Sequence, residues 1–378
     1  MYFLIYSIKS IKNVPKLSLL TKSHNIHFPR VSIILPSRNE EKYIEKCLDS
    51  LLRQDYPDYE IIAINDSSSD KTGEIIKRYS IAHSKIIYVD AQPKPEGWTG
   101  KNWACYQGYL QSKGELFLFT DADSIHSTST ISLAVTYLLS EGLDTLTAIP
   151  KILAFDFWTK ITLPILWTFS VARFSALKAN NPKTKAGYFF GSFFIITRKA
   201  YEMVGTHKSV REEIVEDAEL GKRVKEQGFS LRVVHGEKHI KAIWARNPST
   251  LWHGLRRLLI PLYKKEKIKA YIMTIATFVL LLLPLIILPF SIISVIDGKD
   301  ATRSLIILIL TIMSILSVVI NNIIQLKYSV FQNLLYSLAF PLAASFVLVA
   351  FISSIIHSKQ KDVVNWRDRR YSIKEEKA

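Results

Sequence analysis

Three long stretches without a charged residue dominate the last third of the chain. They run from Tyr271 to Ile296, from Ser304 to Leu326 and from Tyr328 to Ile356. A helix needs about 20 apolar residues to cross a bilayer, so each stretch is long enough. One such stretch alone could be a buried core helix. Three in succession predict a membrane-embedded region over residues 271–357 with about three apolar segments, which makes this an integral membrane protein.

The N-terminal residues do not add a fourth span of this kind. Met1 to Ile8 is apolar but too short, and Lys9 and Lys12 follow it directly. The segment lacks the long apolar core and the small-residue cleavage site of a signal peptide. We expect residues 1–27 to form an N-terminal interfacial segment.

Between these regions, over residues 28–248, four short apolar runs alternate with helical patterns. The runs are Val31–Leu35, Tyr59–Asn65, Lys85–Val89 and Glu115–Thr120, and the stretches between them have helical spacing over residues 41–53, 71–82 and 100–112. This alternation predicts an α/β domain, Rossmann-like, with a mostly parallel sheet and helices on both faces. Ligands of such sheets bind beyond the carboxyl ends of the strands.

Acidic side chains follow the fourth run at that edge. In an extended strand end, residues i and i+2 point the same way, so Asp121 and Asp123 should converge on one point. Two carboxylates held together favour a cation between them. Oxygen ligands predict a hard divalent ion, Mg²⁺ or Mn²⁺, which takes its remaining ligands from substrate phosphates. The pair therefore predicts a diphosphate ligand.

Other nucleotide motifs and cysteine-based sites are absent from the sequence. There is no Gly-x-x-x-x-Gly-Lys-Ser/Thr loop, and no Gly-x-Gly-x-x-Gly follows the first run, so a P-loop or a common dinucleotide site is unsupported. Cys47 and Cys105 are too few for a disulfide framework. They favour a reducing, cytoplasm-facing compartment.

The excess of basic residues, net +16, also needs an explanation. The stretch Leu251–Lys269 alternates leucines with arginines and lysines, which predicts an amphipathic interfacial helix over residues 249–270, bound to a bilayer with anionic headgroups. No motif of a nucleic-acid reader is visible, so we expect no nucleic-acid partner. A basic tail, residues 358–378, ends the chain.

The number of membrane crossings is left open by the charges. The basic flank before Tyr271 should stay on the cytoplasmic side with the catalytic domain, and the loop Asp297–Arg303 is neutral. The tail is also basic and prefers the same side, yet three crossings would put it on the other. The first apolar run, broken by Pro284 and Pro289, could be re-entrant, or an N-terminal element could contribute a crossing.

Five segments, in this order, resemble the family 2 glycosyltransferases, whose catalytic domain has the GT-A fold. They are Val31–Glu40, Asn65–Asp66, Gly100–Gly108, Asp121–Asp123 and Glu216–Asp217. The resemblance covers about residues 30–260. Two more segments, Pro95–Ala104 and Asn365–Tyr371, are similar to a membrane-bound branch that includes ceramide glucosyltransferase-like and carotenoid- or hopanoid-associated enzymes.

The resemblance implies a role for particular residues. Asp217 would be the catalytic base, with Glu216 beside it. Asp123 would ligate the metal, and Asp121 would contact the nucleotide and share the metal. The remaining donor-binding residues would be Pro36, Arg38 and Glu40 in the nucleotide pocket, Asp66 at the base or ribose, Lys101 near the diphosphate, and Gly191 and Ser192 beneath the donor sugar. The family's Gln-x-x-Arg-Trp motif is absent, and Arg256 or Arg257 is its nearest counterpart.

The function implied is a metal-dependent, inverting transfer of a sugar from a UDP- or GDP-linked donor to a hydroxyl of a membrane lipid or polyprenyl-type acceptor. A processive polysaccharide synthase of the same family is one alternative. A sugar-phosphate nucleotidyltransferase would need a glycine-rich loop after the first strand, where Pro36 to Glu40 stand. A non-catalytic membrane scaffold is the third. The sugar, the lipid and the oligomeric state stay open.

Overall fold

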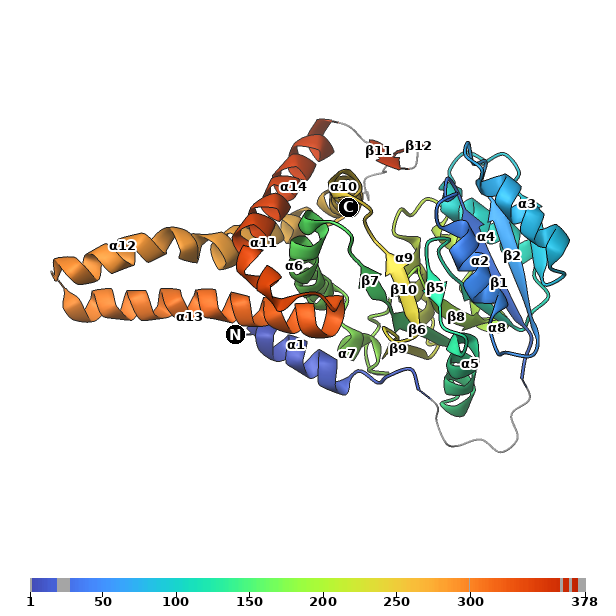
Figure 1. Ribbon diagram of the computed structural model, residues 1–378, viewed down its shortest axis with the longest axis horizontal. Helices are drawn as coiled ribbons and strands as arrows, with labels where there is room; N and C mark the ends of the chain where they lie inside the picture. The colour runs from blue at the N-terminus through green and yellow to red at the C-terminus, as the bar shows by residue number, and fades with distance from the viewer. Residues whose placement is uncertain (1, 19–27, 299, 361–362, 367–368, 373–378) are drawn as a thin grey trace. The chain divides into compact units, whose positions relative to one another are not determined.

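The computed structural model describes residues 2–18, 28–298, 300–360, 363–366 and 369–372. Its elements are shown along the chain in Figure 1. The chain groups into two compact units. Residues 12–153 and 174–243 form one, here called the sheet unit, and residues 1–11, 154–173 and 244–378 form the other, the helical unit. Residues 154–173 thus leave the sheet unit in mid-sequence, and the domain bounds given above stay a prediction.

The sheet unit is built on a seven-stranded sheet with the order β3-β2-β1-β4-β8-β6-β9. Strand β8 is antiparallel to both of its neighbours, whereas β1 pairs in parallel with β2 and β4, β2 with β3, and β6 with β9. The expected mostly parallel α/β sheet is confirmed. The strands are β1 Val31–Ser37, β2 Tyr59–Asn65, β3 Ile86–Asp90, β4 Leu116–Phe119, β6 Thr145–Ile149, β8 Phe194–Thr197 and β9 Leu231–His235.

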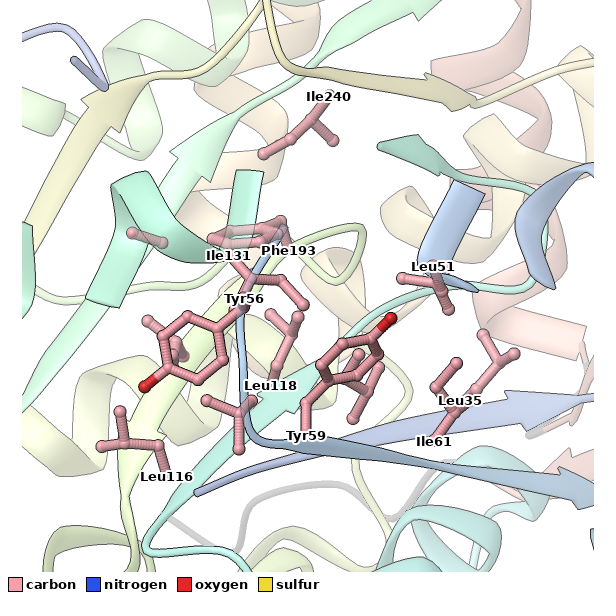
Figure 2. Packing of buried hydrophobic residues seen from close by; sticks show 14 of the residues in the cluster. Leu35, Leu51, Tyr56, Tyr59, Ile61, Leu116, Leu118, Ile131, Phe193 and Ile240 are labelled. Carbon is pink, nitrogen blue, oxygen red and sulfur yellow. The ribbon is translucent and has the colours of Figure 1, made fainter. Parts of the chain in front are cut away.

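Helices cover both faces of this sheet. On one face, Ile33 and Leu35 pack with Leu48 and Leu51 of α2 in a fully buried cluster, part of which is drawn in Figure 2. On the other face, Gly108 of α4 lies so close to Ile34 that an added Cβ would come within 2.8 Å of it. The helices of this unit are α2 Ile44–Leu52, α3 Thr72–Ala82, α4 Gly100–Gln111, α5 Thr130–Ser140, α7 Ala176–Ala179, α8 Arg198–Met203 and α9 Glu216–Glu226.

The carboxyl ends of β1, β2 and β3 lie in register at one edge. Ser37 is paired with Asn65, and Asn65 with Asp90. The loops that follow β1 and β2 are joined there, since the Asp66 amide donates to the Ser37 carbonyl oxygen at 2.8 Å. A short second sheet, β5 Ile125–His126, β10 Ile240–Ile243 and β7 Lys151–Leu153, completes the unit.

The helical unit contains three stretches long and apolar enough to cross a membrane, Lys267–Asp297, Ala301–Val330 and Leu334–His357. They coincide with the three uncharged runs of the sequence. Helices α12 and α13 run alongside each other as a hairpin (Figure 1). The helices of this unit are α1 Tyr2–Asn13, α6 Phe157–Arg173, α10 Pro248–Lys265, α11 Lys267–Thr277, α12 Leu283–Asp297, α13 Ala301–Gln325 and α14 Phe340–Gln360, and β11 Val363–Trp366 pairs with β12 Arg369–Ser372.

The amphipathic interfacial helix expected over residues 249–270 is divided in two in the structure, and its interfacial role stays a prediction. The structure has two helices there, α10 and α11, which meet at Glu266. Leu251, Leu255 and Leu259 of α10 are buried in one cluster with residues of α6 and α14. Their apolar stripe is therefore covered by protein instead of lying open to lipid. A stripe of leucines at helical spacing can face lipid or pack on protein, and only the tertiary contacts distinguish these two cases.

The N-terminal segment also packs within the helical unit. The Ser7 hydroxyl of α1 donates to Asn321 Oδ1 of α13 at 3.1 Å and accepts from Gln325 Nε2 at 3.0 Å. Ile5 and Ile8 are exposed. Residues 19–27 of the predicted interfacial segment lie outside the described residues, and the interfacial role stays a prediction.

Candidate active site

The acidic residues that follow β4 lie in a turn. The Ser124 amide donates to the Asp121 carbonyl oxygen at 3.1 Å, which closes a turn over residues 121–124. Ala122 between them is buried. The expected convergence of Asp121 and Asp123 was argued from an extended strand end, and that geometry is wrong here because the strand stops at Phe119. The turn, and not an extended strand end, therefore sets the directions of their side chains.

Lys101 bridges the turn to a second acidic segment. Its Nζ lies 2.7 Å from Asp121 Oδ1 and 2.7 Å from Glu216 Oε1. Burial alone would lower the pKa of this ammonium, but the carboxylates of Asp121, Glu216 and Asp217 raise it well above its usual value. Lys101 is thus a permanent cation at the centre of the acidic cluster.

Asp217 lies in the first turn of α9, beside this cation. Its Oδ2 accepts a hydrogen bond from the Gly191 amide at 2.8 Å, and its Oδ1 accepts one from the Ala218 amide at 2.8 Å. Desolvation, followed by repulsion from the adjacent Glu216, raises the pKa of Asp217 to about 6, although Lys101 opposes the shift. A carboxylate with a pKa in this range can take up a proton near neutral pH.

Gly191, in the loop before β8, lies next to the charged side chains of Lys101, Asp121 and Asp217. A Cβ at this position would lie 3.0 Å from Asp217 Oδ2, 3.0 Å from Lys101 Nζ and 3.3 Å from Asp121 Oδ2. The neighbouring Ser192 is buried, and its carbonyl oxygen accepts from the Thr120 hydroxyl at 2.9 Å. Only a residue without a side chain leaves the space in front of these charged groups open.

The loops after β1 and β2 form the adjoining part of the edge. Arg38 Nη1 donates to the carbonyl oxygens of Asp66 and Ser67, both at 2.7 Å. Glu40 and Asp66 are almost fully buried. Arg38 therefore ties the two loops together through its guanidinium, while Pro36 lies within β1, opposite Ile64 of β2.

The two buried thiols, Cys47 and Cys105, have pKa values that are shifted by the acidic groups of the site. Burial, and then the carboxylates of Asp123, Glu40 and Asp121, raise the pKa of Cys47. Burial, with Glu216, Asp121 and Asp66, likewise raises the pKa of Cys105, while Lys101 opposes the shift. Carboxylates from several loops and from α9 thus act on both thiols. Both thiols are held in the neutral form.

A family model for glycosyl transferase family 2 matches residues 32–205. Residues 32–205 are thus similar to the family 2 glycosyltransferases. The matched segment includes the loops after β1, β2 and β4, Lys101 and Gly191, so the resemblance noted from the sequence is confirmed.

Two kinds of relative accompany this match. The 4,4'-diaponeurosporenoate glycosyltransferase of Staphylococcus aureus strain N315 is 28% identical over 223 residues, which cover 58% of this chain and 57% of that protein. The protein of the same name in the bovine strain RF122 / ET3-1 is 28% identical over 222 residues. The chain thus spans little more than half the length of these curated relatives.

The fold comparison extends over nearly the whole chain. The mannosyltransferase PcManGT of Pyrobaculum calidifontis, solved in complex with GDP-Man and Mn²⁺, superposes with a TM-score of 0.55 at 16% identity and covers 95% of both chains. At that identity the likeness concerns the fold alone. It confirms the GT-A architecture expected for the family 2 domain.

Some of the oxygen ligands that a divalent metal needs are present in the site. Among the described residues there is no cluster of three or more His, Cys, Asp or Glu side chains placed to hold an ion. Asp121 and Asp123 nevertheless offer carboxylate oxygens from one turn, and the missing side chain of Gly191 keeps space beside Asp121. Mg²⁺ and Mn²⁺ sites in which substrate phosphates supply further ligands need only one or two such carboxylates.

Asn102 is a residue of the site that the sequence patterns did not single out. Its side chain is fully buried, and Nδ2 donates to the carbonyl oxygens of Val210, Arg211 and Glu213 at 2.7, 3.2 and 3.0 Å. It thereby fixes the segment that leads into Glu216. Its sequence signal is its place next to Lys101, inside the segments Gly100–Gly108 and Pro95–Ala104 that carry the family resemblance. Arg256 and Arg257 lie on α10 in the helical unit, and their role at the diphosphate stays a prediction.

Proposed function

We propose that this protein transfers a sugar from a nucleoside-diphosphate sugar, UDP- or GDP-linked, to a hydroxyl of a membrane lipid or polyprenyl-type acceptor. The observation that carries the proposal is the placement of the Asp217 carboxylate. It lies in front of Gly191, next to Lys101 and Asp121, with its pKa raised to about 6. A base of this kind beside a cationic, acid-lined site is what transfer to a hydroxyl requires.

The loops after β1 and β2, together with Lys101, bind the nucleotide-sugar donor. Pro36, Arg38 and Glu40 line the nucleotide pocket, and Asp66 binds the base or ribose. The ammonium of Lys101 faces the diphosphate and, with Asp121, orients it. Gly191 and Ser192 form the floor beneath the sugar, where the absence of a Cβ at residue 191 allows close approach.

The chemical step is a single displacement that inverts the anomeric carbon. Asp217 takes the proton from the acceptor hydroxyl, and the hydroxyl oxygen forms the new bond to the anomeric carbon. The bond from that carbon to the diphosphate oxygen breaks, and the nucleoside diphosphate leaves with its electron pair. Glu216, paired with Lys101, keeps the Asp217 carboxylate from forming a direct ion pair that would lower its basicity.

A metal completes the donor site. Mn²⁺ or Mg²⁺, held by Asp123 and Asp121, would supply positive charge for the departing diphosphate. The neighbour PcManGT was solved with Mn²⁺ and GDP-Man, which supports this assignment. Arg256 or Arg257 would add a further cation on the leaving group.

A lipid acceptor agrees with the three apolar stretches and with relatives named for diaponeurosporenoate. That name describes a carboxylate, which is already ionised at neutral pH and needs no base. The raised pKa of Asp217 favours a hydroxyl acceptor instead. We place the catalytic domain on the cytoplasmic side, because the basic flank of residues 264–269 precedes the first apolar stretch.

The test is transfer in native membranes. Membranes containing the protein are incubated with Mn²⁺ and radiolabelled UDP- or GDP-sugars, and then extracted with organic solvent. The proposal requires label in the organic phase. Label confined to insoluble polymer would favour a processive synthase. Absence of both transfer and nucleoside-diphosphate binding would indicate a scaffold.

Two variants test the assigned roles in the same assay. Asp217→Asn should lower transfer by roughly 10²–10⁴-fold and leave nucleotide binding intact, because only the base is lost. Asp123→Asn should weaken Mn²⁺-dependent binding of the nucleoside diphosphate itself. Glu226→Gln, at the exposed C-terminal end of α9, is the matched control and should retain parental activity. Parental activity in Asp217→Asn would refute the role of Asp217 as the catalytic base. Unchanged Mn²⁺-dependent binding in Asp123→Asn would refute the role of Asp123 as a metal ligand.

A further inference from the structure

The third apolar stretch packs differently from the other two. In its most apolar part 39% of the residues of Leu334–His357 are buried within the protein, against 6% for Lys267–Asp297 and 17% for Ala301–Val330. We infer that only the hairpin of α12 and α13 crosses the membrane, and that α14 lies along the membrane surface with α6 and α10. The inference does not depend on the proposed activity.

The hairpin has the properties of a pair of spans. The first uncharged segment, Tyr271–Ile296, holds 26 residues and runs from α11 through α12, and the second, Ser304–Leu326 in α13, holds 23. At about 1.5 Å per residue each exceeds the roughly 30 Å of the hydrocarbon core. Large apolar side chains point outward along both helices, among them Phe290 at 68% and Leu310 at 61% exposure. Lipid is the environment that suits such a surface.

Helix α14 instead has two distinct faces. Ala343, Val347, Ala350 and Ser354 are fully buried against the unit. Leu342, Val349, Ile352 and Ile356 are between 45 and 55% exposed. Since each residue turns the helix by about 100°, these two sets lie on opposite sides. One face rests on protein and the other is apolar and open, as in a helix lying in the plane of the membrane interface.

Helix α10, which packs on α14, carries charges level with the middle of α14. The Phe346 ring lies 5.5 Å from that of Trp158 on α6 and 5.6 Å from that of Trp252 on α10. The Phe351 ring lies 6.0 Å from Phe169 on α6 and 6.4 Å from Tyr263 on α10. Between these contacts, α10 carries Arg256 and Arg257. The Lys160 ammonium of α6 lies instead at the start of the stretch, 5.8 Å from the centre of the Tyr336 ring.

These charges decide the orientation of α14. If α14 crossed the bilayer, its middle would lie near the bilayer centre, and Arg256 and Arg257 would lie at the same depth. Charged side chains there are costly, whereas basic groups at the surface meet the phosphates of anionic lipid headgroups. The contacts of α14 therefore favour the membrane surface.

A two-crossing arrangement also satisfies the charge distribution. The basic flank of residues 264–269 precedes the hairpin, and residues 357–378 carry seven basic and four acidic residues. The connection Asp297–Arg303 is neutral. Two crossings put both basic segments on the cytoplasmic side and the neutral connection outside, in agreement with the positive-inside rule. Three crossings would place the two basic segments on opposite sides.

Cysteine labelling in intact cells tests the number of crossings. The native Cys47 and Cys105 are buried and give little background. Single cysteines are introduced by Asp300→Cys in the hairpin connection, Ser372→Cys near the C-terminus and Ser84→Cys on the sheet unit, and treated with a membrane-impermeant maleimide. We expect immediate labelling of Asp300→Cys only, and labelling of the other two only after permeabilisation. Labelling of Ser372→Cys in intact cells would overturn the inference.

The depth of α14 gives an independent readout. Nitroxide labels are attached to Leu342→Cys, Val349→Cys and Ile356→Cys in liposomes, and accessibility to oxygen and to a water-soluble nickel complex is measured. A surface helix predicts the same shallow depth at all three positions. The matched series Ile306→Cys, Met313→Cys and Ile320→Cys on α13 should show a maximum of depth at residue 313. A similar maximum at residue 349 would show that α14 spans and would refute the proposal.

Discussion

At the scale of single residues, the site is governed by one cation among several carboxylates. Lys101 contacts both Asp121 and Glu216 at 2.7 Å, and it opposes the upward shift of the Asp217 pKa. Its removal would leave like charges facing one another in a partly desolvated space. The protonation of Asp217 therefore depends directly on a neighbour that takes no proton itself.

The pH dependence of transfer follows from this pair. Only ionised Asp217 accepts a proton, so kcat should fall about tenfold per pH unit below a midpoint near 6 and level off above it. Lys101→Met removes the charge that lowers this pKa, and the midpoint should move to higher pH. The measurement is kcat against pH, with Lys199→Met on the surface of α8 as the control. An unshifted midpoint in Lys101→Met would contradict the coupling.

Gly191 offers a second test at this scale. The Cβ of Gly191→Ala would crowd Lys101 Nζ and Asp217 Oδ2 at 3.0 Å, in the space assigned to the donor sugar. The charged tips can shift, so we expect a Tm close to that of the parent but at least a roughly tenfold loss of kcat/KM. Gly254→Ala, where the nearest atom would be 3.7 Å away, should leave both unchanged. A parental kcat/KM in Gly191→Ala would contradict the placement of Gly191 beneath the donor sugar.

At the scale of elements, two helices carry the groups that we propose to act in catalysis. Helix α9 places Glu216 and Asp217 in its first turn, where acidic residues also interact favourably with the helix dipole. A Cβ at Gly221 of α9 would come within 2.4 Å of the Tyr188 backbone, so the loop that carries Gly191 packs directly on this helix. Helix α4 supplies Lys101, and its Asn102 fixes the segment leading into α9.

Loss of the Asn102 side chain should therefore affect both stability and chemistry. Asn102→Ala leaves three carbonyl oxygens, those of Val210, Arg211 and Glu213, without this donor, which should cost about 1–3 kcal/mol in the free energy of unfolding. We also expect a lower kcat with little change in nucleotide affinity, because Asp217 is displaced.

Chemical denaturation and steady-state kinetics measure the two effects. Gln111→Ala, on the exposed end of the same helix, should change stability by less than about 0.5 kcal/mol. If the Asn102 variant matched it in both measurements, the segment would have to be held by other contacts.

At the scale of the whole molecule, the chain combines a unit similar to the family 2 glycosyltransferases with apolar helices that suit a bilayer. The exposed apolar side chains of α12 and α13 would be unstable in water over so large a surface. The basic groups near these helices add attraction to anionic headgroups, and this contribution is weakened by salt. The two contributions can be separated by experiment.

Membrane extraction separates them. We expect the protein to stay in the membrane pellet after washing with roughly 1 M salt, where charges are screened beyond about 3 Å, and after alkaline carbonate. Detergent should release it, because its hairpin is surrounded by lipid. Immunoblotting of pellet and supernatant is the measurement, with a peripheral membrane protein as the control. Release by salt alone would mean that charge, and not membrane insertion, holds the protein.

Much of this architecture is encoded locally. The runs at Val31–Leu35 and Tyr59–Asn65 predicted β1 and β2, because short apolar segments between helical patterns have few other folded solutions. The three uncharged stretches predicted the apolar helices for the same reason. The order of the motifs, from the loop after the first strand to Glu216 and Asp217, was enough to indicate family 2.

Tertiary contacts decided what local patterns leave open. The leucine stripe of α10 suits lipid and protein equally, and only its packing against α6 and α14 shows that protein covers it. The sequence gives the spacing of Asp121 and Asp123 but not the turn that holds them, since that turn depends on hydrogen bonds within the folded loop. Lys101 lies far along the chain from Glu216, and no local periodicity could pair them. Charge pairing across such distances exists only once the sheet has brought the loops to one edge.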